Sequence, residues 1–316
     1  MLVLNILILL LSLYLIIKFS DIFVDASTSM AESFKVPKMV IALTVAAFST
    51  CVPELAISFN SISSGNVDMT LANVIGSCII NILLIIGVSA IVKPIKLKGR
   101  TIRRELPLLL LITTAFFFLM NDSFFKNVVN SLGRTDGIIL IILFIIFCLY
   151  IVSITRKHKE DYEKEPLYTK KQSIIIMLCT IIGIIVTSDL IVDSAVFIAE
   201  SLHISQKFIA MTIIVIGTSL PELTITVLSA KKGEFDMAIG NIIGTNIFNI
   251  CIVLGLPITI FGAVSSTSFN LIDLLIVLLA ALLLTLFGRS DRELTRREGL
   301  VMLLVVVFYY LYLFIM

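Results

Sequence analysis

The chain has 316 residues, of which 59% are hydrophobic and 15% are charged, and its mean hydropathy is +1.10. A water-soluble domain of this length needs a polar surface that this composition cannot supply, so that class is excluded. The net charge of +2 does not indicate nucleic-acid binding, because the basic residues flank apolar runs. The five cysteines lie inside those runs and form neither a disulfide framework nor a CxxC metal site.

Long apolar runs follow one another along the chain, and a helix needs roughly 20 residues to cross a hydrocarbon core about 30 Å thick. A membrane-spanning barrel would show short alternating segments instead. No basic region precedes the first run, which we therefore interpret as a span and not as a cleaved signal peptide. We predict an all-α polytopic membrane protein with ten transmembrane helices, near 2–19, 36–61, 69–92, 105–120, 136–155, 174–200, 205–230, 237–262, 270–288 and 299–316.

The loops after odd-numbered spans carry 21 of the 24 Lys and Arg residues. By the positive-inside rule these loops are cytoplasmic, which predicts a multi-pass protein of the cell membrane with both termini outside. The longest charged loop, at 156–173, has mixed charges and is predicted to be a cytoplasmic linker.

One stretch of the chain is written twice, first at 42–81 and again at 210–249. The copies align without a gap: Glu222 lies 168 positions after Glu54, and Asn249 lies 168 positions after Asn81. Each half has five spans, an odd number, so the second half enters the membrane from the opposite side. We predict a first repeat at 1–155, a linker at 156–173 and an inverted repeat at 174–316. Broken helices meeting at the midplane are typical of secondary transporters with this architecture.

The first span ends in polar residues, Ser20, Asp21 and Asp25, and the sixth repeats them as Ser188, Asp189 and Asp193. These aspartates have two interpretations. They are interfacial residues or caps at helix ends, or they help to gate or attract cations.

The second span carries the first Pro-Glu pair, at residues 53 and 54. Proline removes a backbone donor and clashes with the carbonyl four residues earlier, which predicts a break or kink near Ser49–Thr50. A carbonyl freed there needs a partner, and a bound cation can serve. Helical spacing places four residues on one face, and the seventh span repeats that face: Ala47, Thr50, Cys51 and Glu54, then Val215, Thr218, Ser219 and Glu222.

The third and eighth spans each carry a polar stripe: Asn73, Ser77 and Asn81 with Gly76 beside them, then Asn241, Thr245 and Asn249 with Gly244. Alone, such a stripe indicates packing between helices. Beside two glutamates, it also fits the opposite wall of a site. The fourth, fifth, ninth and tenth spans are expected to be apolar scaffold.

Placing a carboxylate at the bilayer centre costs about 2.5–3.5 kcal/mol on insertion scales. Two such carboxylates at equivalent positions of a repeat therefore need an explanation. One is a pair of protonated, hydrogen-bonded glutamates. The other is a cation site, in which Glu54 and Glu222 supply charge and oxygens and the helix breaks add carbonyls. Calcium takes 6–8 oxygen ligands in flexible geometry, magnesium is stricter, and transition metals favour imidazole or thiolate. Hydroxyls suit sodium, so we predict a site where calcium and sodium compete, with no cofactor.

These motifs resemble the alpha repeats of the cation/calcium exchanger superfamily, and the compact prokaryotic sodium/calcium exchangers most closely. The resemblance covers the whole chain and includes GTSLPE at 217–222 and GNIIGTN at 240–246. It implies a non-enzymatic antiporter that exports calcium against inward sodium by alternating access, with spans 1 and 6 sliding across the bundle.

The resemblance also implies ligands. Calcium would be held by Glu54 and Glu222 with the backbone of Thr50 and Thr218. One sodium position would be lined by Ala47, Thr50, Cys51 and Ser77, the other by Val215, Thr218, Ser219 and Thr245, and the site lining would include Asn81 and Asn249.

Three residues depart from the family pattern. Ser49 replaces the usual glycine, Cys51 replaces the usual hydroxyl residue, and Asn249 stands where many relatives have aspartate. A thiol is a poor sodium ligand, and an amide neither takes up a proton nor adds charge. Cys51 therefore leaves the affinity or geometry of one sodium position open, and Asn249 weakens the case for potassium or proton coupling at that position.

Three other functional classes would show different features. A proton-coupled or potassium-dependent calcium antiporter would follow a pH or potassium gradient. A cation channel would surround a pore with symmetric subunits, and an intramembrane protease would need a nucleophile with its base, which the sequence does not offer. We expect partners limited to Ca²⁺, Na⁺ and the lipid bilayer, no nucleic acid or protein partner, and a functional monomer.

Overall fold

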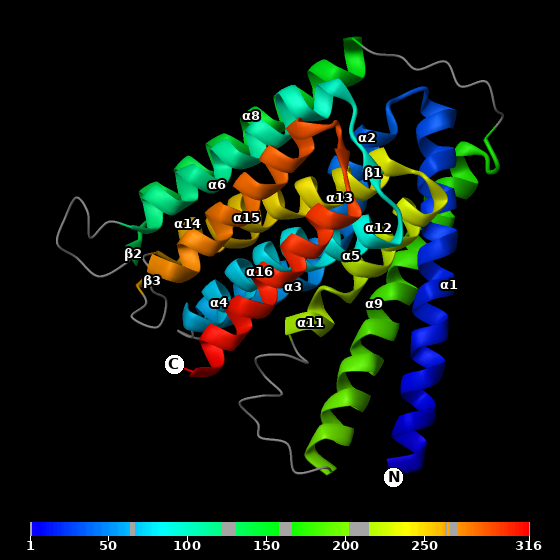
Figure 1. Ribbon diagram of the computed structural model, residues 1–316, viewed down its shortest axis with the longest axis horizontal. Helices are drawn as coiled ribbons and strands as arrows, with labels where there is room; N and C mark the ends of the chain where they lie inside the picture. Colours follow the sequence, from blue (N-terminus) through cyan, green and yellow to red (C-terminus); the bar gives the residue numbers. More distant parts are fainter. Residues whose placement is uncertain are drawn as a thin grey trace.

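The computed structural model describes residues 2–63, 67–121, 131–157, 166–201, 215–262, 264–265 and 271–315. Within these residues the helices group into ten stretches, five in each half (Figure 1). Segments labelled η are π-helical. The first half contains α1 (Leu2–Phe34), α2 (Lys38–Ile41) with η1 (Ala42–Ala46) and α3 (Ala47–Ser63), α4 (Val67–Ile79) with η2 (Ile80–Ile86) and α5 (Gly87–Val92), η3 (Thr101–Glu105) with α6 (Leu106–Met120), and α8 (Arg134–Lys157).

The second half repeats this order. It contains α9 (Lys170–Ser201), α11 (Val215–Thr218) with α12 (Leu220–Lys232), α13 (Phe235–Phe248) with η5 (Asn249–Leu254) and α14 (Gly255–Phe261), α15 (Leu271–Ser290), and α16 (Arg296–Ile315). Six helical stretches in the described residues are long and apolar enough to span a membrane, and a bent pair makes a seventh. The predicted all-α polytopic fold is confirmed. Residues 158–165 of the predicted linker lie outside the described residues.

The first helix is much longer than its predicted span. α1 runs for 33 residues, about 50 Å at 1.5 Å per residue, which exceeds a hydrocarbon core of about 30 Å. Asp21 and Asp25 lie well inside α1, so the interpretation of these residues as helix-end caps is wrong. Their carboxylates pair with Lys232 Nζ at 2.9 and 2.7 Å, and these partners allow the helix to continue past them.

The two Pro-Glu helices are interrupted differently. In the second half Ser219 separates α11 from α12, one residue beyond the expected position. In the first half α3 continues through Ser49–Thr50, and a bend of 51° separates residues 38–52 from 57–63. The predicted kink is therefore present in this half, but it lies a few residues beyond Ser49–Thr50, and the helix is not broken there. The proline at 53 removes only one hydrogen bond, and packing of α3 on α13 and η5 supports the helix on either side.

Two short antiparallel ribbons tie the halves together. β1 (Ile95–Lys96) of the first half pairs with β4 (Glu293–Leu294) of the second, and β2 (Ser131–Leu132) pairs with β3 (Val264–Ser265). The ribbons lie at opposite ends of the helical bundle (Figure 1). Because each ribbon joins a segment of one half to a segment of the other, the two halves are interlocked.

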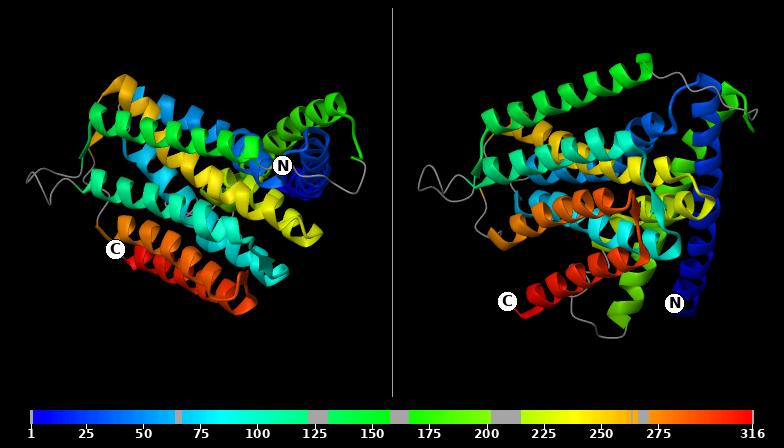
Figure 2. Two further views of the ribbon diagram at one scale, coloured as in Figure 1. Left: turned by 90° about the horizontal axis from the view of Figure 1, so that it is seen from above. Right: turned by 45° about the horizontal axis from the view of Figure 1, so that its top comes forward.

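The apolar interior divides into two clusters. One contains buried residues of α3 to α8 and α13 to α16. The other joins α1 and α9 to a few residues of α2, η1, α12 and α13. α1 and α9 lie side by side and cross the remaining helices steeply (Figures 1 and 2). The pair therefore forms a separate layer against the rest of the bundle.

Candidate ion-binding site

Two buried carboxyl groups lie at the centre of the candidate site. Glu54 on α3 and Glu222 on α12 are each only 1% exposed. The groups are close enough to interact electrostatically with one another. Within the described residues neither carboxylate forms an ion pair with a basic side chain. This part of the bundle therefore holds two acidic groups that no basic side chain of the described residues neutralises.

Most polar atoms around these carboxylates lack a protein partner. Within the described residues, no hydrogen bond is made by one oxygen of Glu54, both oxygens of Glu222, or the hydroxyls of Ser77, Ser219 and Thr245. Both amide atoms of Asn81 and of Asn249 are also without a partner. Buried polar groups in native proteins are nearly always satisfied, so these atoms are available to water or to a bound ion. All of these residues were predicted from the sequence to line the site.

The first wall of the site is one face of α3. Thr50 is buried and its hydroxyl donates to the Ala47 carbonyl at 3.1 Å. Cys51 is buried and its thiol donates to the Thr245 carbonyl of α13 across 3.8 Å. Ala47, Thr50, Cys51 and Glu54 thus share one helical face, as their spacing predicts. The equivalent face of the second half contains Ser219 and Glu222; the side chains of Val215 and Thr218 lie outside the described part of the chain.

The polar stripes of α4 and α13 serve two purposes. Asn73 donates to the Glu54 backbone carbonyl at 3.3 Å, and Asn241 donates to the Thr226 hydroxyl at 3.1 Å. These two asparagines hold each stripe against its neighbouring helix, as packing residues do. The next polar residues along each stripe, beginning with Ser77 and Thr245, are those without partners. Each stripe therefore combines an asparagine that bonds to a neighbouring helix with residues whose polar atoms have no partner among the described residues.

Each stripe ends in a π-helical segment. Asn81 is the second residue of η2 and Asn249 is the first residue of η5. π-helical turns are rare and are frequently found at functional sites, because the wider turn changes the direction of the side chains that follow. The repeat thus places the same backbone irregularity at both asparagines.

No group of three or more His, Cys, Asp or Glu side chains in the described residues is arranged to hold a metal ion. The side chains of the candidate site offer mainly carboxylate, hydroxyl and amide oxygens, which suit hard cations such as calcium and sodium.

Two further buried acids, which were not predicted from the sequence, lie in the helices expected to be scaffold. Glu105 accepts a hydrogen bond from Tyr150 of α8 and pairs with Arg100 at 3.3 Å. Asp273 accepts from Tyr309 of α16 at 2.9 Å. The acids lie 168 positions apart, which is the repeat offset. That offset was the available signal, because it marks them as equivalent residues joining the fourth and fifth helices of their halves.

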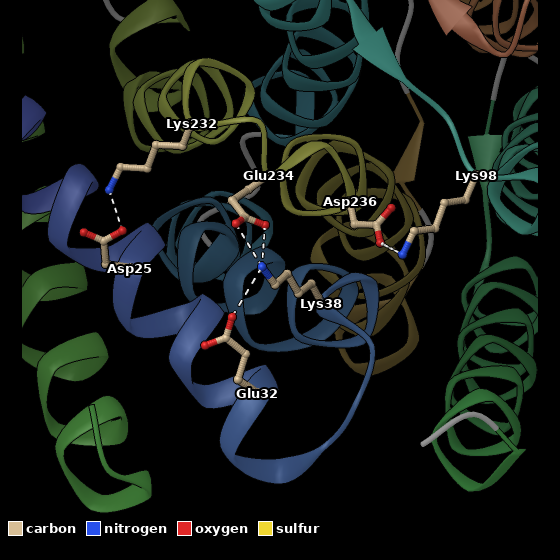
Figure 3. A network of polar contacts seen from close by, with 7 residues as sticks. All are labelled: Asp25, Glu32, Lys38, Lys98, Lys232, Glu234 and Asp236. Carbon is tan, nitrogen blue, oxygen red and sulfur yellow. Dashed lines mark hydrogen bonds and ion pairs between the residues drawn. The ribbon is translucent and has the colours of Figure 1, made fainter. Parts of the chain in front are cut away.

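Charged residues gather where α1 meets the bundle (Figure 3). Lys38 contacts Glu234 at 2.8 Å and Glu32 of α1 at 3.6 Å. Lys232 contacts Asp21 and Asp25 of α1, and Lys98 contacts Asp236 at 2.8 Å. Lys38 of α2 therefore links α1 to Glu234, which follows α12, and Lys232 links α1 to the end of α12.

Comparison with known proteins places the whole chain among cation transporters. The family model described as "Sodium/calcium exchanger protein" matches residues 4–153 and 172–316. Inner membrane protein YrbG of Escherichia coli (strain K12) is 35% identical over 259 residues, which cover 79% of this chain and 78% of that protein. Sodium/calcium exchanger MaX1 of Methanosarcina acetivorans is 30% identical over 352 residues, which cover 99% of each.

A similar solved structure is that of the sodium-calcium exchanger NCX_Mj soaked with Na⁺ and Sr²⁺. The TM-score is 0.84 at 31% sequence identity, and the match covers 98% of both chains. The expected relation to the compact prokaryotic exchangers is confirmed. The similar proteins with an assigned activity are exchangers and not enzymes.

Proposed function

Because the chain belongs to the sodium/calcium exchanger protein family, we propose that it exports Ca²⁺ from the cell in exchange for Na⁺ that enters down its gradient. The observation that carries this proposal is the pair of buried glutamates with carboxylate oxygens that the protein leaves unpartnered. Calcium is the substrate whose charge and coordination number best match such a pair.

In the proposed calcium-bound state, Glu54 and Glu222 supply two negative charges and up to four oxygens. The backbone carbonyls of Thr50 and Thr218 complete the set. This gives up to six oxygens, the number at which calcium coordination begins. Because each half supplies one carboxylate, removal of either glutamate leaves a buried Ca²⁺ ion with only one neutralising charge, which is costly.

Sodium competes for the same region by using other oxygens. One proposed position is lined by Ala47, Thr50, Cys51 and Ser77, and the other by Val215, Thr218, Ser219 and Thr245. Asn81 and Asn249 complete the lining. Several sodium ions can replace the charge of one calcium ion there, so occupancy by the two substrates is mutually exclusive. This competition couples the two gradients.

We propose that access alternates by movement of α1 and α9 across the other helices. The division of the apolar interior into two clusters supports this, because a layer with its own packing can move as a unit. The excess of Lys and Arg in the loops after odd-numbered spans supports both termini lying outside and the 156–173 loop being cytoplasmic. We propose a monomer as the working unit.

The experiment is radiolabelled calcium uptake into sodium-loaded proteoliposomes, with and without an outward sodium gradient. We expect uptake to need internal sodium and to fall at least a hundredfold in Glu54→Gln and in Glu222→Gln, because each removes a charged ligand of a buried cation at a cost of about 3 kcal/mol or more. Asp68→Asn is the matched control, since Asp68 is an exposed acid of the first repeat, and its uptake should match that of the unmodified protein.

Two further uptake conditions distinguish sodium coupling from proton coupling and from potassium dependence. Uptake that follows a pH gradient without sodium would assign the protein to proton-coupled antiporters. Removal of potassium should leave uptake unchanged, since the Asn249 amide offers no charge for an additional monovalent cation. An absolute potassium requirement would overturn that expectation.

A further inference from the structure

The two halves of the candidate site differ in ligand chemistry at one pair of equivalent positions. Glu54 and Glu222 are identical, as are Asn81 and Asn249, and both Ser77 and Thr245 carry hydroxyls. The exception is Cys51, whose equivalent 168 positions later is Ser219. The first half therefore presents a soft sulfur atom where the second presents a hard oxygen.

The thiol lies inside the candidate site. Cys51 is 2% exposed, and its Sγ is 3.8 Å from the Thr245 carbonyl oxygen. It is three residues before Glu54 on the same helix, and side chains at that spacing are neighbours. Glu54 and Glu222 both act on it electrostatically. The Thr245 hydroxyl and one Glu54 oxygen are buried without a partner in the described residues, so both are available to a bound cation.

We propose that Cys51 makes the site a high-affinity position for a soft divalent cation, Cd²⁺, which competes with calcium. The inference rests on the proposed calcium transport through the same site. Thiolate ligands select soft metals, whereas calcium and sodium gain nothing from sulfur. The ligands are Cys51 Sγ, the Glu54 carboxylate and the Thr245 carbonyl oxygen. As the sulfur–cadmium bond forms, the thiol proton passes to water.

Binding of Cd²⁺ to a cysteine other than Cys51 is the alternative that the experiment must distinguish. Cys78 on α4 is buried and is near enough to Cys51 to interact with it electrostatically. Cys179 on α9 is exposed, and α9 belongs to the other apolar cluster. Cys78→Ala tests the neighbouring thiol, and Cys179→Ser is a control in which an exposed thiol is removed away from the site.

The test measures calcium uptake in proteoliposomes against increasing Cd²⁺, each variant being scaled to its own uptake without Cd²⁺. Cys51→Ser should raise the Cd²⁺ concentration for half-inhibition by about tenfold or more, as loss of a metal contact typically does. Cys179→Ser and Cys78→Ala should leave it unchanged. Ser219→Cys, which places a thiol in the second half as well, should lower it.

A second measurement keeps the proposal testable if a variant transports no calcium. Purified protein is titrated with Cd²⁺ while the ultraviolet thiolate-to-cadmium band is followed. The unmodified protein should develop the band and Cys51→Ser should lack it, whatever gradient drives transport. The proposal is overturned if Cys51→Ser keeps the band or the unmodified half-inhibition, or if Cys78→Ala loses them instead. Calcium uptake that does not depend on sodium would contradict the proposed function, but it would leave the Cd²⁺ titration and its interpretation unchanged.

Discussion

Ser49 and Gly217 are equivalent residues whose surroundings differ. The Ser49 hydroxyl donates to the Val45 carbonyl at 2.6 Å, within its own helix. Gly217 instead faces Val192 of α9 so closely that a Cβ atom would overlap with the valine side chain. The first half therefore accommodates a side chain at this position, and the second half does not.

This difference predicts an asymmetric result for reciprocal substitutions. Gly217→Ser should destabilise the protein by about 1–3 kcal/mol, because overpacking forces backbone or side-chain shifts, and should lower calcium uptake by displacing the turn at Ser219. Ser49→Gly should change stability by about 1 kcal/mol or less, the cost of a helical glycine. Thermal unfolding in detergent and uptake in proteoliposomes are the measurements. Equal effects of the two substitutions would show that α9 does not press on Gly217.

Many site residues could be predicted from the sequence because the repeat identifies them in pairs. A polar residue inside an apolar run is informative once its equivalent is polar too, as with Asn81 and Asn249. Asn73 and Asn241 show the limit of this argument, because they are equally well paired but bond to neighbouring helices. Whether a buried amide is used for packing or for a ligand depends on the partner that tertiary structure brings within reach.

At the scale of elements, Lys232 provides the link between α12 and α1. Its amine contacts the Asp21 and Asp25 carboxylates and the Asp21 carbonyl oxygen, the last at 2.9 Å. Partial burial alone would lower the pKa of this amine, but its hydrogen bonds with the two aspartates raise the pKa overall. The lysine is therefore charged at neutral pH, and it holds α1 in the position that the structure shows.

Loss of this link should affect movement more than stability. Exposed ion pairs contribute about 0–1 kcal/mol, so Lys232→Gln should shift the free energy of unfolding by no more than about 1 kcal/mol. The same substitution should lower the free-energy cost of moving α1 away from α12 by up to about 1 kcal/mol. Calcium flux should therefore rise about two- to fivefold at low ionic strength. High salt should remove the difference.

A charge-reversed pair provides the control for this prediction. Lys232→Asp combined with Asp25→Lys keeps an ion pair between α1 and α12, so its flux should return toward that of the unmodified protein. Flux that stays raised in the double variant, or that falls in Lys232→Gln, would contradict a restraining role for the link.

Element positions were largely predictable from the sequence, whereas element irregularities were not. The ten apolar runs locate the ten helical stretches because lipid requires long apolar helices. Nothing in the residues of η2 or η5 distinguishes them from α-helix, since both segments are mostly Ile, Leu and Val. The wider π turns depend on contacts between helices. Those contacts form only when the two halves are packed together, so they cannot be predicted from one segment of sequence.

The whole molecule consists of a two-helix layer, α1 with α9, set against an interlocked bundle. Within the layer, α1 and α9 pack closely, and a Cβ atom on Gly183 would lie 2.8 Å from the Phe19 ring. Between the layer and the bundle, the Ser20 hydroxyl of α1 donates to the Thr224 hydroxyl of α12 at 2.7 Å. Phe19 therefore packs against α9, whereas Ser20 contacts α12 of the bundle. Cysteines at these two positions can test whether α1 and α9 move together as a rigid layer.

Cysteine pairs at these positions should have opposite effects on transport. Ser20→Cys with Thr224→Cys brings two sulfurs within bonding reach, so oxidation should fix α1 to the bundle and reduce calcium flux at least tenfold. Phe19→Cys with Gly183→Cys joins α1 to α9 and should leave flux within about twofold after oxidation, because the layer can still move as one body. Reduction should restore flux in the first pair, and gel mobility after proteolysis between the cysteines measures the extent of cross-linking. Full flux in completely cross-linked Ser20→Cys/Thr224→Cys protein would show that α1 does not move relative to α12 during exchange.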